Sequence, residues 1–145
     1  MEAHAAAGKS YPPTTYAVGR EKIREYAHAT GESDPLHLDV DAARAAGYRD
    51  LVAPPMFAVV YAAPALAPGL FDPEVGIDFG RMVHGGQEFK WGPLVISGDE
   101  ITTTVTLQDV TARESMSFYV FESVSENQEG DTVCVGTWTN IVRGG

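Results

Sequence analysis

The chain has 145 residues, the length of one domain with a single hydrophobic core. Hydrophobic residues make up 44% of the sequence and charged residues 21%, as in ordinary globular proteins, and no apolar run is long enough to cross a bilayer. The formal net charge of −10 argues against a nucleic-acid partner, because phosphate backbones are bound by clustered Lys and Arg.

The sequence predicts one domain over residues 10–145, preceded by a disordered tail over residues 1–9. The tail is small and polar, without the basic start and long apolar stretch of a signal peptide. The single cysteine, Cys134, cannot form an internal disulfide and has no His or Cys at metal-ligand spacing. We therefore expect a buried structural thiol, no metal site and a cytoplasmic protein.

The first predicted elements are a short strand at residues 14–18 and a helix at residues 20–30, which Gly31 would end. The loop that follows, residues 30–37 (TGESDPLH), carries two carboxylates and an imidazole around a proline. Since proline disfavours the helical region for the residue before it, we expect these groups on irregular backbone. A carboxylate near an imidazole is suited to acid–base catalysis.

The most apolar segment lies further along the chain, after a brief helix predicted at residues 42–46. Residues 51–66 (LVAPPMFAVVYAAPAL) predict a buried helix from Pro54-Pro55 to about residue 66. Pro64 should loosen its last turn, and Pro68-Gly69 should end it.

The second half of the chain has the period of strands. The predicted strands cover residues 82–91, 101–110, 115–125 and 132–142, with a bulge at Gly85-Gly86. Short turns join them, so they should be mostly antiparallel. The predicted fold class is therefore α+β: a curved antiparallel sheet wrapped around one buried helix.

Taken together, these motifs resemble MaoC-like hot-dog proteins, the (R)-specific enoyl-thioester hydratases and 3-hydroxyacyl-thioester dehydratases. The loop of that family, roughly Gly-Asp-x-Asn-Pro-Leu-His, stands here as residues 31–37 (GESDPLH). The segments that resemble its FAS1-like dehydratase branch are residues 20–26 (REKIREY), 52–57 (VAPPMF), 83–89 (VHGGQEF) and 93–99 (PLVISGD). The resemblance extends along nearly the whole chain and implies a hot-dog fold. It also implies Glu32 and His37 as the catalytic acid–base pair.

Three positions depart from the family's pattern. Glu32 stands in place of an aspartate and extends its carboxylate by one methylene, a misplacement that can cost on the order of 100-fold in rate. Asp34 stands in place of an asparagine and only accepts hydrogen bonds when ionised. Pro54-Pro55 replaces the histidine-glycine pair that opens the helix. The second proline has no amide hydrogen, so the amides of Met56 and Phe57 remain to bind a thioester oxygen.

Five side chains are candidate substrate contacts: Asp34, Met56, Phe57, His84 and Gln87. Each has another interpretation. Asp34 fits a cap of backbone amides beside a proline. Met56 and Phe57 fit the core as well as an acyl pocket. His84 fits a buried hydrogen bond to the backbone, and Gln87 fits a contact with a partner.

The only dense group of basic residues is Arg20, Lys22 and Arg24. It is typical of a solvated helix face, with contact to the phosphates of coenzyme A or of an acyl carrier protein's prosthetic group as the alternative.

The first functional hypothesis is a hydro-lyase that hydrates a 2-enoyl thioester of coenzyme A or acyl carrier protein to the (R)-3-hydroxy form and catalyses the reverse dehydration. No cofactor other than the thioester carrier is expected. The alternative is a non-catalytic acyl-binding subunit of a heterodimeric dehydratase, and a weaker alternative is an acyl thioesterase. Because a single sheet exposes its edge strands, we expect a homodimer or a heterodimer with a related hot-dog subunit.

Overall fold

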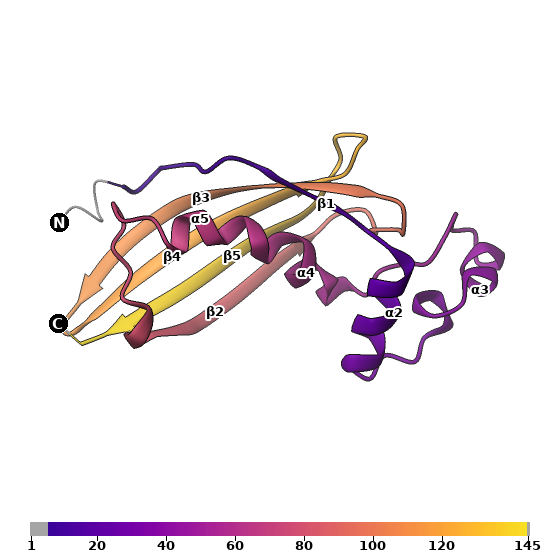
Figure 1. The fold of residues 1–145 in the computed structure, drawn as a ribbon, viewed down its shortest axis with the longest axis horizontal. Helices are drawn as coiled ribbons and strands as arrows, with labels where there is room; N and C mark the ends of the chain where they lie inside the picture. Colours follow the sequence, from indigo (N-terminus) through magenta and orange to yellow (C-terminus); the bar gives the residue numbers. More distant parts are fainter. Residues whose placement is uncertain (1–5, 145) are drawn as a thin grey trace.

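A five-stranded antiparallel sheet forms the centre of the protein (Figure 1). The computed structural model describes residues 6–144. Within them the strands are β1 (Thr14–Ala17), β2 (Met82–Trp91), β3 (Glu100–Arg113), β4 (Met116–Glu126) and β5 (Thr132–Arg143). Their order across the sheet is β1-β3-β4-β5-β2, so β2 is an edge strand. This arrangement confirms the predicted α+β architecture, and the register shift between His84 and Gly86 confirms the predicted bulge.

The helical segments lie in two places. Two α-helices, α2 (Arg20–Ala29) and α3 (Val40–Ala45), stand at one end of the sheet with a 3₁₀ turn, η1 (Pro35–His37), between them (Figure 1). The central helix runs across one face of the sheet as η2 (Pro55–Phe57), α4 (Ala58–Ala62), η3 (Ala63–Leu66) and α5 (Ala67–Leu70). A last 3₁₀ turn, η4 (Phe79–Arg81), leads into β2. Nowhere in residues 6–144 is a helix long and apolar enough to span a membrane.

Two prolines divide the central helix, which continues to residue 70 rather than ending near residue 66 as predicted. Pro64 has no amide hydrogen to give to an α-helical bond, and the chain tightens to a 3₁₀ segment around it. Pro68 lies in the first turn of α5, where a missing amide is tolerated. Gly69 lets this last turn approach the sheet, since a Cβ there would lie 2.6 Å from the Phe121 ring.

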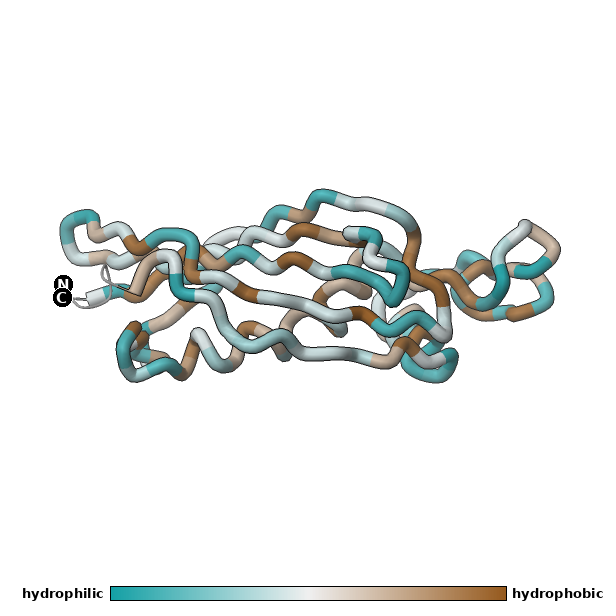
Figure 2. Tube along the Cα trace, turned by 90° about the horizontal axis from the view of Figure 1, so that it is seen from above, coloured by the Kyte–Doolittle hydropathy of each residue, from teal (hydrophilic) through white to brown (hydrophobic). Residues whose placement is uncertain are grey.

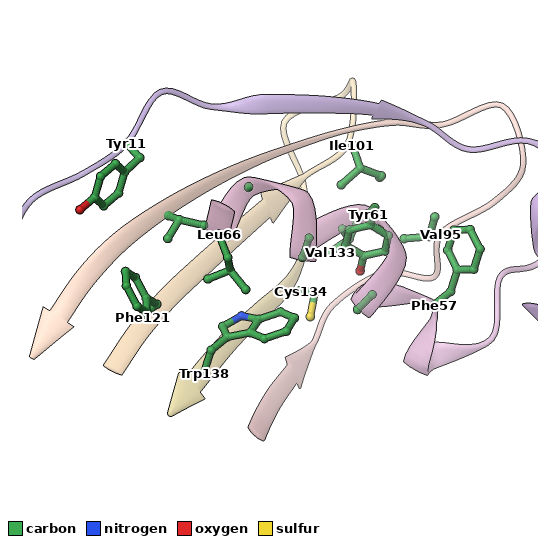
Figure 3. Packing of buried hydrophobic residues seen from close by; sticks show 14 of the residues in the cluster. Tyr11, Phe57, Tyr61, Leu66, Val95, Ile101, Phe121, Val133, Cys134 and Trp138 are labelled. Atoms are coloured by element: carbon green, nitrogen blue, oxygen red, sulfur yellow. The ribbon is translucent and has the colours of Figure 1, made fainter. Parts of the chain in front are cut away.

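The hydrophobic core fills the space between the central helix and the sheet (Figure 3). Phe57, Tyr61 and Leu66 lie on the helix side, facing buried residues of the strands such as Phe121 and Trp138. The strand side chains alternate between buried and more exposed positions, and the hydropathy along the chain alternates with them (Figure 2). In β3 the buried residues include Ile101, Thr103, Val105 and Leu107, as the period predicted.

The segment before β1 lies along the sheet. The Gly8 amide donates to the Leu107 carbonyl at 2.7 Å, and the Tyr11 amide donates to the Val105 carbonyl at 2.9 Å. The prediction of a disordered tail is therefore wrong for residues 6–9, because β3 offers free backbone groups that pair with them. Residues 1–5 of that predicted tail lie outside the described part of the chain.

Asp72, just after the central helix, anchors this N-terminal segment. Its carboxylate accepts a hydrogen bond from the Tyr11 hydroxyl at 2.8 Å and forms an ion pair with Lys9 at 2.7 Å. The Lys9 ammonium, the Tyr11 hydroxyl and the Glu74 amide together lower the pKa of Asp72 to about 2.

Asp72→Asn should destabilise the protein at neutral pH, and the difference from wild type should shrink in acid. Because the Asp72 pKa is lower in the folded chain than in the unfolded chain, its stabilisation is complete above the ordinary value of about 4 and is lost as the pH falls toward 2. Urea unfolding of both proteins between pH 7 and pH 3 measures this. Asp131→Asn, at an exposed position in the turn before β5, is the control for the loss of one negative charge. A difference in unfolding free energy between wild type and Asp72→Asn that stays constant with pH would contradict the stabilising role of the Asp72 carboxylate.

Candidate functional site

The candidate site is built around the extended segment of residues 51–53. The Val52 amide donates to the Leu36 carbonyl at 2.9 Å, which ties the segment to the loop predicted as the acid–base site. The Ala53 amide donates to the Val95 carbonyl at 2.9 Å, which ties it to the loop after β2. Two loops far apart in the sequence are thus fixed on one short stretch of backbone directly before the central helix.

His37 lies on this segment with only 8% of its surface exposed. Its Nδ1 is 2.6 Å from the Val52 carbonyl oxygen. Because a carbonyl can only accept, Nδ1 must carry the hydrogen. In the neutral ring Nε2 then has a free lone pair, and it has no hydrogen-bond partner among residues 6–144. The imidazole is therefore oriented as a base.

The turn η1 fixes the position of this histidine. Pro35 opens the turn, and the Asp34 carboxylate caps it by accepting from the Leu36 amide at 3.0 Å. The capping interpretation of Asp34 is confirmed. A contact between this exposed carboxylate and a substrate stays a prediction.

Glu32 is exposed, and its carboxylate has no hydrogen bond or ion pair among residues 6–144. Burial and then the Glu32 charge raise the pKa of the Tyr26 hydroxyl. That hydroxyl donates to the Met56 carbonyl at 3.1 Å. His37 and Tyr26 thus bind the two ends of the stretch from Val52 to Met56, and no hydrogen bond joins Glu32 to His37 among residues 6–144.

An apolar cavity of about 230 Å³ opens between these two ends. Its walls come from the segment before the central helix, the helix itself, the end of β2 and the following loop. The lining residues are Ala53, Pro54, Pro55, Tyr61, Trp91, Gly92, Pro93, Leu94, Val95 and Val133. A cavity with this lining is suited to an acyl chain. Residues 92–95 show no periodic pattern that would mark them as lining a cavity, because their backbone is irregular.

The start of the central helix has one backbone amide without a partner among residues 6–144. The Phe57 amide donates to the Pro54 carbonyl at 2.9 Å, so it is already satisfied. The Met56 amide has no hydrogen-bond partner among residues 6–144. The prediction that both amides remain available is therefore wrong for Phe57.

The two side chains predicted to touch substrate here differ in burial. Phe57 is completely buried, with the Tyr26 ring packed edge-on at 5.6 Å, which confirms its interpretation as a core residue, and a contact with substrate stays a prediction. Met56 is about half exposed and can still face a ligand.

The edge strand β2 holds the remaining two predicted residues. His84 is exposed, and its ring lies 6.3 Å from the Trp138 ring, so the interpretation as a buried hydrogen bond is wrong. Gln87 is half-buried, and its Oε1 is a buried acceptor with no donor among residues 6–144. A buried amide oxygen without a donor is costly, so this position favours a group supplied by a ligand or a second chain.

Asp99 is a site-supporting residue that sequence reasoning missed. Its buried carboxylate accepts from the Ile96 amide at 2.9 Å and from Gln128 Nε2 at 2.9 Å, and it forms an ion pair with Arg49. These contacts hold the loop that lines the cavity. The Gly98-Asp99 turn was visible in the sequence, but the partners of the carboxylate come from distant segments.

Two other predictions have clear outcomes. Cys134 is buried, and burial raises the pKa of its thiol to about 11, which confirms a structural thiol.

In the basic group of α2, Arg20 pairs with Asp50, Lys22 with Glu25 and Arg24 with Glu21, so each charge is matched by a carboxylate. This fits a solvated helix face rather than a phosphate site. Residues 6–144 contain no cluster of side chains able to hold a metal ion.

The comparisons with known sequences agree with this architecture. A family model described as "FAS1-like, dehydratase domain region" matches residues 5–135. The chain is 46% identical over 138 residues to a UPF0336 protein of Leifsonia xyli subsp. xyli, covering 94% of this chain and 93% of that one. It is 44% identical over 138 residues to a UPF0336 protein of Saccharopolyspora erythraea, covering 94% and 88%.

Solved structures share the fold. The C-terminally truncated HadBC (3R-hydroxyacyl-ACP dehydratase) complex of Mycobacterium tuberculosis contains a chain with a TM-score of 0.77 and 28% identity, covering 94% of this chain and 96% of that one. The R-hydratase PhaJ1 of Pseudomonas aeruginosa has a TM-score of 0.72 at 16% identity, covering 96% and 83%, and supports the fold alone. The predicted hot-dog fold is confirmed.

The hydrogen bond to Val52 predicts a single tautomer for His37. Two-dimensional ¹H–¹⁵N spectra at a pH where the ring is neutral should show a protonated Nδ1 and a proton-free Nε2. The exposed His84 serves as the internal reference and should show a mixture of tautomers. A protonated Nε2 on His37 would contradict the assignment and remove the base.

Proposed function

Because this chain belongs to the FAS1-like dehydratase family, we propose that it is a subunit of an (R)-specific enoyl-thioester hydratase or 3-hydroxyacyl-thioester dehydratase that works as a hot-dog dimer. The substrate is an acyl thioester of coenzyme A or of acyl carrier protein. The observation that carries the proposal is the orientation of His37: a buried imidazole, held at Nδ1, that presents Nε2 as a base.

The proposed reaction assigns one proton to each reacting group. In dehydration, His37 Nε2 takes the proton from C2 of the 3-hydroxyacyl thioester, and the C3–O bond breaks as protonated Glu32 gives its proton to the departing hydroxyl. Water and the 2-enoyl thioester result, and hydration runs through the same steps in reverse. The Met56 amide is the donor available to the thioester oxygen, on which negative charge develops when C2 loses its proton.

The cavity before the central helix would take the acyl chain. Its lining is apolar and includes Ala53, Pro54 and Pro55, which lie in the chain between Val52, bonded to His37, and Met56, bonded to Tyr26. A chain that lies in the cavity therefore places its thioester end near the base and near the free amide. This supports a thioester substrate over a polar small molecule.

A second candidate function is that of an acyl-binding subunit whose related partner supplies the catalysis. Two observations favour it. The carboxylate of Glu32 is exposed and unsupported, whereas a catalytic acid is normally fixed by neighbours. Pro54-Pro55 removes an amide from the helix start, so only one donor remains. The similarity to a chain of the HadBC complex is compatible with this assignment.

The edge strand β2 supports dimer formation in either case. Its outer backbone groups have no strand partner among residues 6–144, and Val83 and Trp91 on it are 43% and 49% exposed. An uncovered apolar edge favours pairing with another chain. A second hot-dog subunit placed there could also supply the donor that the buried Gln87 oxygen lacks.

His37→Ala should lower the rate of crotonyl-thioester hydration by roughly 100-fold or more, and Glu32→Gln should do the same if Glu32 is the acid. Spectrophotometric assays of the enoyl chromophore measure this. The control is His28→Ala on the exposed face of α2, which should leave the rate unchanged. An active protein whose rate survives His37→Ala would refute the assignment. Release of free thiol instead of hydration would identify a thioesterase.

Val83→Lys should weaken the dimer, because it places a charge on the apolar β2 edge. Sedimentation at several concentrations measures the change in dimer affinity, and Val135→Lys on the neighbouring strand β5 is the control.

If the protein alone is an inactive dimer and gains activity only with a related hot-dog chain, regardless of His37→Ala, the acyl-binding role is correct. A stable wild-type monomer would exclude dimer formation by the chain on its own.

A further inference from the structure

Most cations of this acidic chain are matched by carboxylates. Of its ten Lys and Arg residues, seven form an ion pair within residues 6–144. The three that form none there are Lys90, Arg113 and Arg143. Because the overall charge of −10 repels an anionic ligand, the place where unmatched cations gather determines where such a ligand can bind.

Two of these three cationic residues, Arg113 and Arg143, lie close together in the sheet. Met116 at the start of β4 pairs with Arg113 on one side and with Arg143 on the other, so the two arginines flank one residue across three strands. Arg81 comes directly before Met82, which pairs with Val142 next to Arg143. Three arginines thus lie at the same end of the sheet, opposite α2 and α3 (Figure 1), and the side chains of two of them, Arg81 and Arg143, line one hollow.

A hollow of about 370 Å³ opens at this end. It is lined by Gly80, Arg81, Met82, Val83, Arg143 and Gly144. The Arg81 side chain is only weakly neutralised, since its ion pair with Asp78 spans 3.7 Å and both groups are exposed. A Cβ at Gly144 would collide with the Arg81 guanidinium, so the glycine backbone provides a surface against which that group lies. Two arginines at one hollow match the geometry of a phosphate.

The hollow lies at the far end of β2 from the acyl cavity of the same chain. Met82 and Trp91 bound β2 and are separated by about 30 Å at the rise of a strand. If two β2 edges pair antiparallel about a two-fold axis, the Met82 end of one chain meets the Trp91 end of the other. Since Trp91 lines the cavity, the arginines of one subunit then stand beside the cavity of its neighbour.

Resting on the proposed function, we propose that Arg81 and Arg143, flanked by Arg113, bind the phosphate of a pantetheine thioester carrier whose acyl group enters the neighbouring subunit's cavity. Coenzyme A and the prosthetic group of acyl carrier protein both carry such a phosphate. Each subunit thus contributes the anion site for its partner's cavity, and neither site is complete in one chain.

The test compares thioesters with and without phosphate. Arg81→Gln/Arg143→Gln should raise KM for crotonyl-coenzyme A by roughly tenfold for each arginine, leave kcat unchanged, and leave KM for crotonyl-pantetheine unchanged, because that substrate has no phosphate. The control, Lys22→Gln/Arg44→Gln, removes the same charge from the opposite end of the molecule and should alter neither KM. A crotonyl-acyl carrier protein arm identifies the source: a KM rise with coenzyme A alone assigns the site to the nucleotide carrier, and a rise with both assigns it to the shared phosphate.

A binding measurement separates this proposal from the proposed function. Calorimetric titration of the wild-type dimer, or of its complex with a related hot-dog chain, with coenzyme A should show binding that the double variant loses at least tenfold. Such a loss in a protein without hydratase activity supports the phosphate site while the catalytic role fails. Equal KM and equal affinity in the wild type and the double variant, with activity intact, would overturn the phosphate site and leave the proposed function standing.

Discussion

Backbone hydrogen bonds on both sides of residues 51–53 are the constraint on which the site depends. One side holds the loop with His37, and the other holds the loop that lines the cavity. Since each bond joins main-chain groups or a ring nitrogen to main chain, the geometry does not depend on long flexible side chains. The carbonyl that holds the imidazole, part of the cavity wall and the free Met56 amide lie within the five residues 52–56, so a shift of this stretch would affect all three.

The edge strand β2 is where the monomer is least complete. It joins exposed apolar side chains, an unsatisfied buried amide oxygen and unpaired backbone groups along a single line. Its two ends also differ in character: an apolar cavity lies at Trp91, and an arginine-lined hollow lies at Met82. Antiparallel pairing brings unlike ends together, so a two-fold dimer would complement itself where a single chain cannot.

Carboxylates organise the rest of the molecule locally rather than through net charge. Asp99 fixes the cavity loop, Asp72 fixes the N-terminal segment, and Asp50 pairs with Arg20 beside the His37 loop. The guanidinium of Arg20 lowers the pKa of Asp50 to about 2, as expected for a charge-assisted bond. With these cations already engaged, the excess negative charge is left on the surface, and few positive groups remain for an anionic ligand.

The sequence alone determined the strands, the helix predicted at residues 20–30, the bulge in β2 and the loop that presents His37, because hydrophobic period, glycine and proline act over a few neighbouring residues. It also identified the family through motifs spread along the chain. It did not determine the hydrogen bond from His37 to Val52, the loss of the Phe57 amide, the exposure of Glu32, the contacts of Asp99 or the place of Arg143 beside Arg81. Those depend on which distant segments meet, and only tertiary packing decides that, since a carbonyl or carboxylate has no partner until another part of the chain is placed against it.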